Sequence, residues 1–253
     1  MHPPLETLTW KSRVVRSFSV ASSTYNAASD LQAQAAQLLA TRVLHYAWNW
    51  PNILEVGCGT GGLTQLLMPY LPGNWIISDL SPAMLLATQR CLSSPLAQFR
   101  VMDGEKPDLP AESLGLIVSN LAAQWFENLP RALQHMATCL HTRGRLLLTT
   151  LGEDSLLEWR QAVATTGHDA GTPRYPSAQM LADALPMALV TSHPIKMSYP
   201  SALEFLRSLK DIGATTPRNG YRPLPMPILK HAMRNMSSPC QVTYEVLILD
   251  WVK

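Results

Sequence analysis

The chain has 253 residues, 47% of them hydrophobic, which suits one α/β domain with a sizeable core and room for an inserted cap. Its formal net charge of +2 argues against a dedicated nucleic-acid-binding protein. The four cysteines show no C-x-x-C spacing, which argues against a zinc site or a disulfide framework and suits a reducing compartment.

The two usual signals for membrane insertion or secretion are not found in the sequence. No uninterrupted apolar run reaches the roughly 18 residues of a membrane span. The N-terminal stretch MHPPLETLTWKSRVV lacks the long apolar core of a signal peptide. We therefore expect a cytoplasmic protein that does not cross a membrane. The histidines show no metal-ligand spacing, and we expect no metal site.

Two helices are expected before the first strand, over residues 15–25 and 29–47. Asp30 is a plausible N-cap of the second helix. The apolar residues of that helix fall on one face, as the helical period requires: they are Leu31, Ala35, Leu38, Leu39 and Val43.

From residue 52 onward, strand-like and helix-like runs alternate. Such alternation predicts right-handed β-α-β crossovers and a mainly parallel, doubly wound sheet. The expected helices cover 62–71, 81–92 and 129–140, and the second begins with Ser-Pro, a cap followed by proline. The expected strands are 52–57, 74–80, 97–104, 114–121 and 143–151.

The later part of the chain is less regular. Helices are expected near 154–166, over 177–185, over 201–213 and after the proline-rich loop 217–227. Between them, LVTSHPIKMSYP at 189–200 is strand-like, and QVTYEVLILDWVK at 241–253 predicts a final strand.

The turn after the first strand, VGCGTGG, is rich in glycine and fits two cofactor loops. The glycines at 57, 59 and 62 match the dinucleotide pattern G-x-G-x-x-G, whereas Gly57, Gly59 and Gly61 with Glu55 match the S-adenosylmethionine pattern E-x-G-x-G-x-G. Both rest on the same physics, because glycine allows a tight turn and a close approach of the backbone to a ligand.

Acidic residues at successive strand ends favour S-adenosylmethionine. An anion at Glu55 would repel a pyrophosphate but can orient an ammonium group. Asp79 ends the second strand and would bond both ribose hydroxyls, a feature that NAD sites share. Asp103 follows the third strand, where an adenine amino group needs an acceptor. The expected cofactor site comprises Glu55, Gly57, Gly59, Gly61, Asp79, Leu80, Asp103, Gly104 and Asn120.

These motifs carry a family resemblance. ILEVGCGTG, SDLSPAML and MDGEKPDLP resemble class I S-adenosylmethionine-dependent methyltransferases, a Rossmann-like fold with seven strands, the last antiparallel. Residues 18–39, 119–133 and 208–220 resemble, more specifically, the malonyl-acyl-carrier-protein O-methyltransferases. The resemblance runs from about Phe18 to the end of the sequence and does not cover residues 1–17, which could be a basic arm or disorder. We expect one domain with a helical lid (1–48), a cofactor-binding core (49–151), a cap with later sheet elements (152–240) and a final strand (241–253).

The resemblance also implies a reaction, the transfer of a methyl group from S-adenosylmethionine to the free carboxylate of a malonyl thioester at the start of biotin (pimeloyl) synthesis. The thioester is carried by acyl carrier protein, or alternatively by CoA. Such a carboxylate is already ionised at pH 7 and needs no general base. The protein has to orient it and exclude water.

A carboxylate that enters a dry pocket needs a partner. Arg174, in the irregular segment after the fifth strand, is our first candidate because arginine offers a bidentate fork, and Arg160 is the second. Tyr25 is the other catalytic candidate: by resemblance its segment closes over the cofactor, which would bring its hydroxyl to the substrate carboxylate or to the cofactor. Gln124 and Trp125 follow the fourth strand and are expected to line the acyl pocket.

Basic residues gather late in the chain, and this suggests a docking surface for an acidic carrier protein. Residues 190–240 hold seven basic and two acidic side chains, a net charge of +5, and 196–234 is the expected docking segment. Three alternatives stay open: methylation of another small carboxylate or a carbon nucleophile, a non-catalytic S-adenosylmethionine-binding protein, and an NAD-dependent dehydrogenase.

Overall fold

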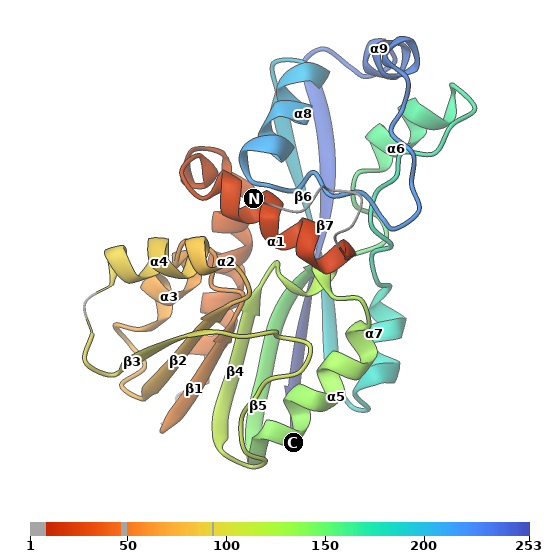
Figure 1. Cartoon of the computed structure of the whole chain (residues 1–253). Coiled ribbons are helices and arrows are strands. Elements are labelled where there is room, and N and C mark those ends of the chain that lie inside the picture. Colours follow the sequence, from red (N-terminus) through yellow and green to blue (C-terminus); the bar gives the residue numbers. More distant parts are fainter. Residues whose placement is uncertain (1–8, 47–49, 93) are drawn as a thin grey trace.

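The computed structural model describes residues 9–46, 50–92 and 94–253. These residues form a seven-stranded sheet in the order β3-β2-β1-β4-β5-β7-β6 (Figure 1). β7 is antiparallel to both of its neighbours, and the other described pairs are parallel, as expected. The strands are β1 (Asn52–Val56), β2 (Asn74–Asp79), β3 (Ala97–Val101), β4 (Leu114–Asn120), β5 (Leu140–Leu151), β6 (Leu189–Tyr199) and β7 (Cys240–Val252).

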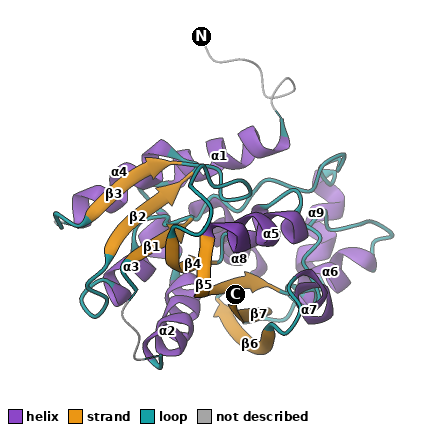
Figure 2. Cartoon of the chain, turned by 90° about the horizontal axis from the view of Figure 1, so that it is seen from below, coloured by secondary structure: helices purple, strands orange, loops and turns teal. Residues whose placement is uncertain are grey.

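Helices cover both faces of the sheet. One buried cluster joins α2 and α3 to β1 and β2, and a second joins α5 and α7 to the opposite face (Figure 2). α4 begins as the sequence predicts, because the Ser81 side chain accepts from the Met84 amide and Pro82 follows. These helices are α2 (Asp30–Leu44), α3 (Gly62–Leu67), α4 (Pro82–Cys91), α5 (Leu129–Cys139) and α7 (Ala178–Ala184).

A cap stands on an extension of the sheet. Residues 246–252 of β7 pair with β5, but residues 240–245 pair with β6 alone, so the two strands project beyond the other five. A third apolar cluster packs on this hairpin and includes Trp159, Phe205 and Tyr244. Its helices are α6 (Leu157–Ala164), α8 (Ala202–Asp211) and α9 (Met226–Arg234). The cap is therefore continuous with the core.

The N-terminal helix starts earlier than the sequence pattern indicates. α1 runs from Trp10 to Ala21, because the Thr9 side chain accepts from the Ser12 amide and caps the helix there. A short 3-10 turn, η2 (Tyr25–Ala28), then leads to α2. α1 lies between the sheet and the cap (Figure 1). The parts of the expected lid at 1–8 and 47–48 lie outside the described residues.

None of the helices in the described part of the chain is long and apolar enough to cross a membrane.

Candidate active site

The glycine-rich turn sits at the carboxyl end of β1. Gly57, Gly59 and Gly61 all have positive φ angles, a conformation that side chains disfavour. A Cβ atom at Gly57 would lie 2.4 Å from the Cβ of Ala122, which follows β4. One at Gly61 would lie 2.9 Å from the Thr88 methyl carbon. The glycines are therefore required both by the turn and by the close approach of its neighbours.

Asp79, at the end of β2, is held against this turn. One carboxylate oxygen accepts from the Gly59 amide at 2.9 Å and the other from the Ser81 amide at 2.7 Å. Burial raises the pKa of Asp79 to about 6, although these backbone bonds oppose the rise. The side chain is thus fixed in orientation before any ligand arrives.

Glu55 lies deeper, within β1, and is 1% exposed. Its carboxylate accepts from the Thr64 hydroxyl at 2.5 Å. Burial, with a smaller contribution from the charge of Asp79, raises the pKa of Glu55 to about 8 against the opposing bond from Thr64. No ion pair to Glu55 is present among the described residues. A buried and a half-buried carboxyl group beside one turn favour a cationic ligand and disfavour a pyrophosphate.

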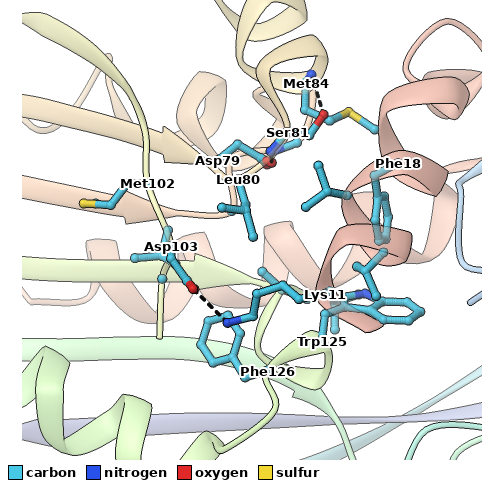
Figure 3. A pocket seen from close by; sticks show the side chains of 18 of the residues that line it. Lys11, Phe18, Asp79, Leu80, Ser81, Met84, Met102, Asp103, Trp125 and Phe126 are labelled. Carbon is cyan, nitrogen blue, oxygen red and sulfur yellow. Dashed lines mark hydrogen bonds and ion pairs between the residues drawn. The ribbon is translucent and has the colours of Figure 1, made fainter. Parts of the chain in front are cut away.

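Two cavities border this turn, and a third adjoins them. Cavity A lies between the strand ends and α1; Figure 3 shows Asp79, Leu80 and Asp103 on one side and Phe18 and Lys11 on the other. Cavity B lies behind it and is lined by Glu55, Asn26, Gln32 and residues 57–60. The third, the chamber, has a volume of about 400 Å³ and extends under the cap.

Tyr25 is the one described residue that lines all three cavities. Its hydroxyl oxygen lies 3.8 Å from where a Cβ of Gly59 would be. Burial, and next the charge of Asp79, raises the pKa of Tyr25 well above its usual value, so the phenol stays protonated at neutral pH. A neutral donor therefore stands where the cavities meet.

The walls of the chamber are almost entirely apolar or aromatic. Among the described residues, no charged side chain lines it. Its polar groups are neutral hydroxyls and amides, which include Gln124, Tyr175 and Gln32; the Gln32 amide oxygen is buried without a hydrogen-bond partner among the described residues. Gln124 donates to the Leu121 carbonyl at 2.6 Å and is thereby fixed in orientation. An anion entering here would meet uncharged donors.

Most of the residues predicted from the sequence meet at these cavities. Asn120 is held by bonds from Thr149 to its side-chain oxygen and from its amide nitrogen to the Gln32 carbonyl. Cavity A contains Gly57, Gly59, Asp79, Leu80, Asp103, Gly104, Asn120 and Trp125; cavity B contains Glu55, Gly57, Gly59 and Asn120; the chamber contains Tyr25, Gln124 and Trp125.

Three predicted residues lie apart from the cavity walls. Gly61 shapes the turn as the left-handed N-cap of α3 but lines no cavity. Arg174 is exposed, although its neighbours Pro173 and Tyr175 line the chamber. Arg160 donates to the Glu153 carbonyl at 2.6 Å and is also outside the lining.

Sequence reasoning missed the contribution of α1. Lys11, Val14, Val15 and Phe18 all line cavity A, and Lys11 forms an ion pair with Asp103 at 2.8 Å. The only signal was the mixed apolar and basic spacing of WKSRVVRSF, which also suits a solvated arm. The closure of cavity A depends on tertiary contacts that this spacing does not encode.

Comparison with known proteins shows the family to which this chain belongs. Residues 54–148 match the family described as "Methyltransferase domain". A malonyl-acyl-carrier-protein O-methyltransferase from Magnetococcus marinus is 35% identical over 233 residues, which cover 88% of this chain and 86% of that protein. The chain belongs to the malonyl-acyl-carrier-protein O-methyltransferase family.

A second relative of this methyltransferase is longer. The biotin biosynthesis bifunctional protein BioCD of Bordetella avium is 38% identical over 244 residues, which cover 95% of this chain. The chain spans about half the length of that relative, 52%.

Solved structures show the same methyltransferase fold at low identity. The YcgJ protein from Bacillus subtilis aligns with a TM-score of 0.62 at 16% identity, covering 86% of this chain and 98% of that one. Phosphoethanolamine N-methyltransferase 2 from Haemonchus contortus, solved with S-adenosylhomocysteine, aligns with a TM-score of 0.64 at 11% identity, covering 99% of this chain and 61% of that one. The expected fold class is thereby confirmed.

Proposed function

We propose that this methyltransferase uses S-adenosylmethionine to methylate the free carboxylate of a malonyl group carried by acyl carrier protein, or secondarily by CoA. The product would enter biotin (pimeloyl) synthesis. The observation that carries the proposal is the meeting of cavities A and B with an uncharged chamber at Tyr25.

The residues at cavities A and B fit the proposed cofactor. Glu55 offers a buried carboxyl group, with no ion-pair partner among the described residues, to the cofactor's ammonium group. Asp79 offers carboxylate oxygens to the ribose hydroxyls, and Asp103 with Gly104 would face the adenine. S-adenosylmethionine, when bound, supplies an activated methyl group on a positively charged sulfur.

The chain itself would orient the substrate and exclude water. A malonyl carboxylate is already ionised at neutral pH, so no residue has to remove a proton from it. In the chamber it would meet neutral donors such as Tyr25 and Gln124, which leave its charge to face the cationic sulfur. Apolar walls, including Leu121 and Trp125, would keep competing water away. Arg160 and Arg174 have no part in this proposal.

The function is tested by offering labelled S-adenosylmethionine to a matched panel of acceptors. We expect label to move to malonyl-acyl carrier protein and, more slowly, to malonyl-CoA, but not to acetyl-acyl carrier protein, which has no free carboxylate. Succinyl-acyl carrier protein tests chain length, and free malonate tests the need for the thioester. If label moved only to succinyl-acyl carrier protein or only to free malonate, the substrate would be another small carboxylate and not a malonyl thioester.

We further propose that the carrier protein docks beside the chamber, on the loop 217–227 and α9. Arg218 is already paired with Asp169 at 3.0 Å, so its charge is partly neutralised. Arg222 and Lys230 are exposed, and their chain neighbours Tyr221, Pro223 and Leu229 line the chamber. Within the basic segment 196–234, Arg222 and Lys230 are therefore well placed to meet an acidic partner, as is the exposed Lys210 beside the chamber-lining Leu209.

Charge reversal tests the docking surface. Arg222→Glu combined with Lys230→Glu should raise KM for malonyl-acyl carrier protein roughly fivefold at low salt, because such contacts mainly speed association. KM for malonyl-pantetheine should not change, since this uncharged arm has neither the carrier's acidic surface nor the phosphates of CoA. Arg100→Glu, on the exposed edge strand β3, is the matched control. An equal rise in KM for both substrates would show that the variant has damaged the chamber and would refute docking there.

A further inference from the structure

α1 lies between cavity A and the loop that follows α8, and it contacts both. Toward cavity A it presents Val14, Val15 and Phe18. Toward the loop, the Trp10 indole donates to the Pro217 carbonyl at 2.8 Å, and the Ser17 and Thr216 hydroxyls lie 3.1 Å apart. Residues 214–217 also line the chamber. One helix therefore touches the walls of both the proposed cofactor site and the proposed substrate site.

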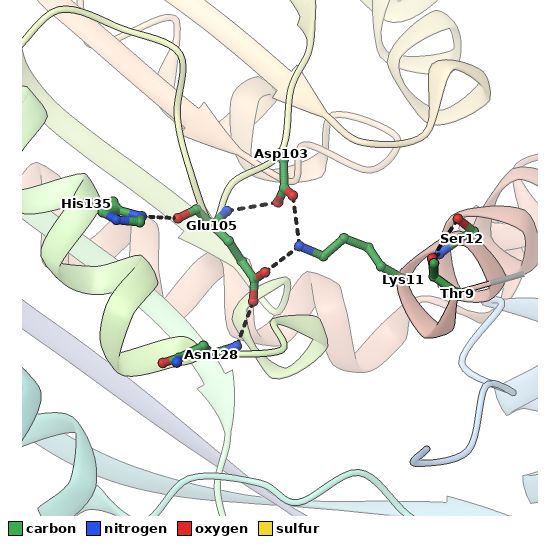
Figure 4. A network of polar contacts seen from close by, with 7 residues as sticks. All are labelled: Thr9, Lys11, Ser12, Asp103, Glu105, Asn128 and His135. Atoms are coloured by element: carbon green, nitrogen blue, oxygen red, sulfur yellow. Dashed lines mark hydrogen bonds and ion pairs between the residues drawn. The ribbon is translucent and has the colours of Figure 1, made fainter. Parts of the chain in front are cut away.

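Lys11 ties this helix to the carboxyl side of β3. Its ammonium group contacts Asp103 at 2.8 Å and also bonds the Glu105 carboxylate (Figure 4). The lysine side chain is 20% exposed, so solvent screens this double ion pair less than it screens a surface pair. Burial lowers the pKa of Lys11, but the bonds to the two carboxylates outweigh that effect and raise it overall.

The two carboxylates are held from the other side by the core. The Glu105 amide donates to Asp103 at 3.0 Å, and the second Glu105 oxygen accepts from the Asn128 amide at 2.9 Å, just before α5. His135 of α5 bonds the Glu105 carbonyl at 2.7 Å (Figure 4). Lys11 is thus the α1 partner of an anionic pair that the core has already fixed in place.

We infer that Lys11 is a positioning residue that latches α1 over cavity A and, through α1, fixes the chamber wall at 214–217. The inference rests on the proposed function, because it assigns cavity A to S-adenosylmethionine. Asp103 can accept a further bond while it holds Lys11, since a carboxylate has about four acceptor sites. An adenine amino group and the lysine would then share one carboxylate, and the bound cofactor would lie beneath the latched helix.

The latch couples the two ligands. Moving α1 away to admit the cofactor breaks the Lys11 pairs and also the contacts of Trp10 and Ser17 with the loop. Under this inference, the chamber wall is complete again only once α1 has closed over the cofactor. We expect S-adenosylmethionine to bind first and the malonyl thioester second.

Lys11→Met tests the latch, because it keeps an unbranched side chain only one atom shorter and removes the charge. By calorimetry, it should weaken binding of both S-adenosylmethionine and S-adenosylhomocysteine about tenfold, a change of about 1.4 kcal/mol. Raising the salt concentration should weaken binding by the wild type more than by the variant. Lys11→Arg should restore most of the affinity. The matched control is Arg16→Met, which removes an exposed cation from the same helix.

A second readout separates the latch from a general loss of folding. Lys11→Met should also raise KM for malonyl-acyl carrier protein at saturating cofactor, while the melting temperature without cofactor stays near that of Arg16→Met. Wild-type affinity in Lys11→Met, or equal losses in both variants, would overturn the inference. If the wild type binds the cofactor but methylates none of the acceptors, the proposed substrate is wrong. The calorimetric comparison of cofactor binding still tests the latch in that case.

Discussion

Replacing Asp79 with asparagine should weaken S-adenosylmethionine binding by about a hundredfold, because hydrogen bonds to a charged acceptor are each worth roughly 1.5–3 kcal/mol. An asparagine keeps one acceptor oxygen and turns an amide group toward the second partner. It would therefore also lose one of the bonds from the Gly59 and Ser81 amides that hold the side chain in place. Calorimetric titration with the cofactor measures the change.

The stability of the cofactor-free Asp79→Asn variant serves as the internal check. Burial raises the pKa of Asp79 to about 6, so at pH 7 the folded protein carries a buried charge that costs stability. Asparagine removes that cost while losing one backbone bond, and these effects oppose each other. The variant should melt close to the wild type. Asp108→Asn, at an exposed position, should change neither property. Unaltered affinity in Asp79→Asn would remove Asp79 from the cofactor site.

Cofactor binding should release about one proton at neutral pH through Glu55. Its pKa of about 8 means that the cofactor-free protein holds this carboxyl mostly protonated at pH 7. A neighbouring ammonium group favours the charged form, so binding ionises it. Affinity should therefore rise with pH, by at most about tenfold per unit, and level off above a pH of about 8. Calorimetry in buffers of different ionisation enthalpy counts the released protons.

Glu55→Gln should abolish this proton release and flatten the pH dependence of affinity, whereas Glu153→Gln, at an exposed position, should not.

The raised pKa of Glu55 also makes the stability of the cofactor-free protein depend on pH. The pKa is raised on folding, so the stabilisation from the bound proton is fully present below about pH 4.5 and is lost as the pH rises to about 8. Melting temperatures of the cofactor-free protein should fall over that range. A pH-independent affinity in the wild type would contradict the assignment.

Local patterns predicted the core and the cofactor turn well. The period of the strands and helices, the Ser-Pro cap at Ser81 and the glycines of the turn are all determined by residues near one another in the chain. Asp79 and Asp103 could be placed because the carboxyl ends of parallel strands meet at one edge of the sheet. The family resemblance added the antiparallel β7, which the structure confirms.

Long-range contacts account for what the sequence did not predict. The importance of Lys11 depends on Asp103 and Glu105, more than ninety positions away. The exposure of Arg174 depends on how its segment packs on the cap, where Ala170 and Tyr175 face the apolar cluster and Arg174 does not. Neither the ion pairs of Lys11 nor the exposure of Arg174 is encoded by a periodic pattern or a motif. The local sequence could therefore indicate the type of segment in which each residue lies, but not the contacts of its side chain.

The position of β7 has a consequence for synthesis on the ribosome. It is the last of the seven described strands to emerge, yet it lies between β5 and β6 and bonds to both. Until residues 240–252 leave the exit tunnel, β5 presents an open edge, β6 has no partner, and the helices beneath which the chamber lies have no complete support. The nascent protein can pair β1 to β5 around the glycine-rich turn early, but the part that encloses the chamber must wait for residues 240–252. That interval is when the chain is most exposed to aggregation.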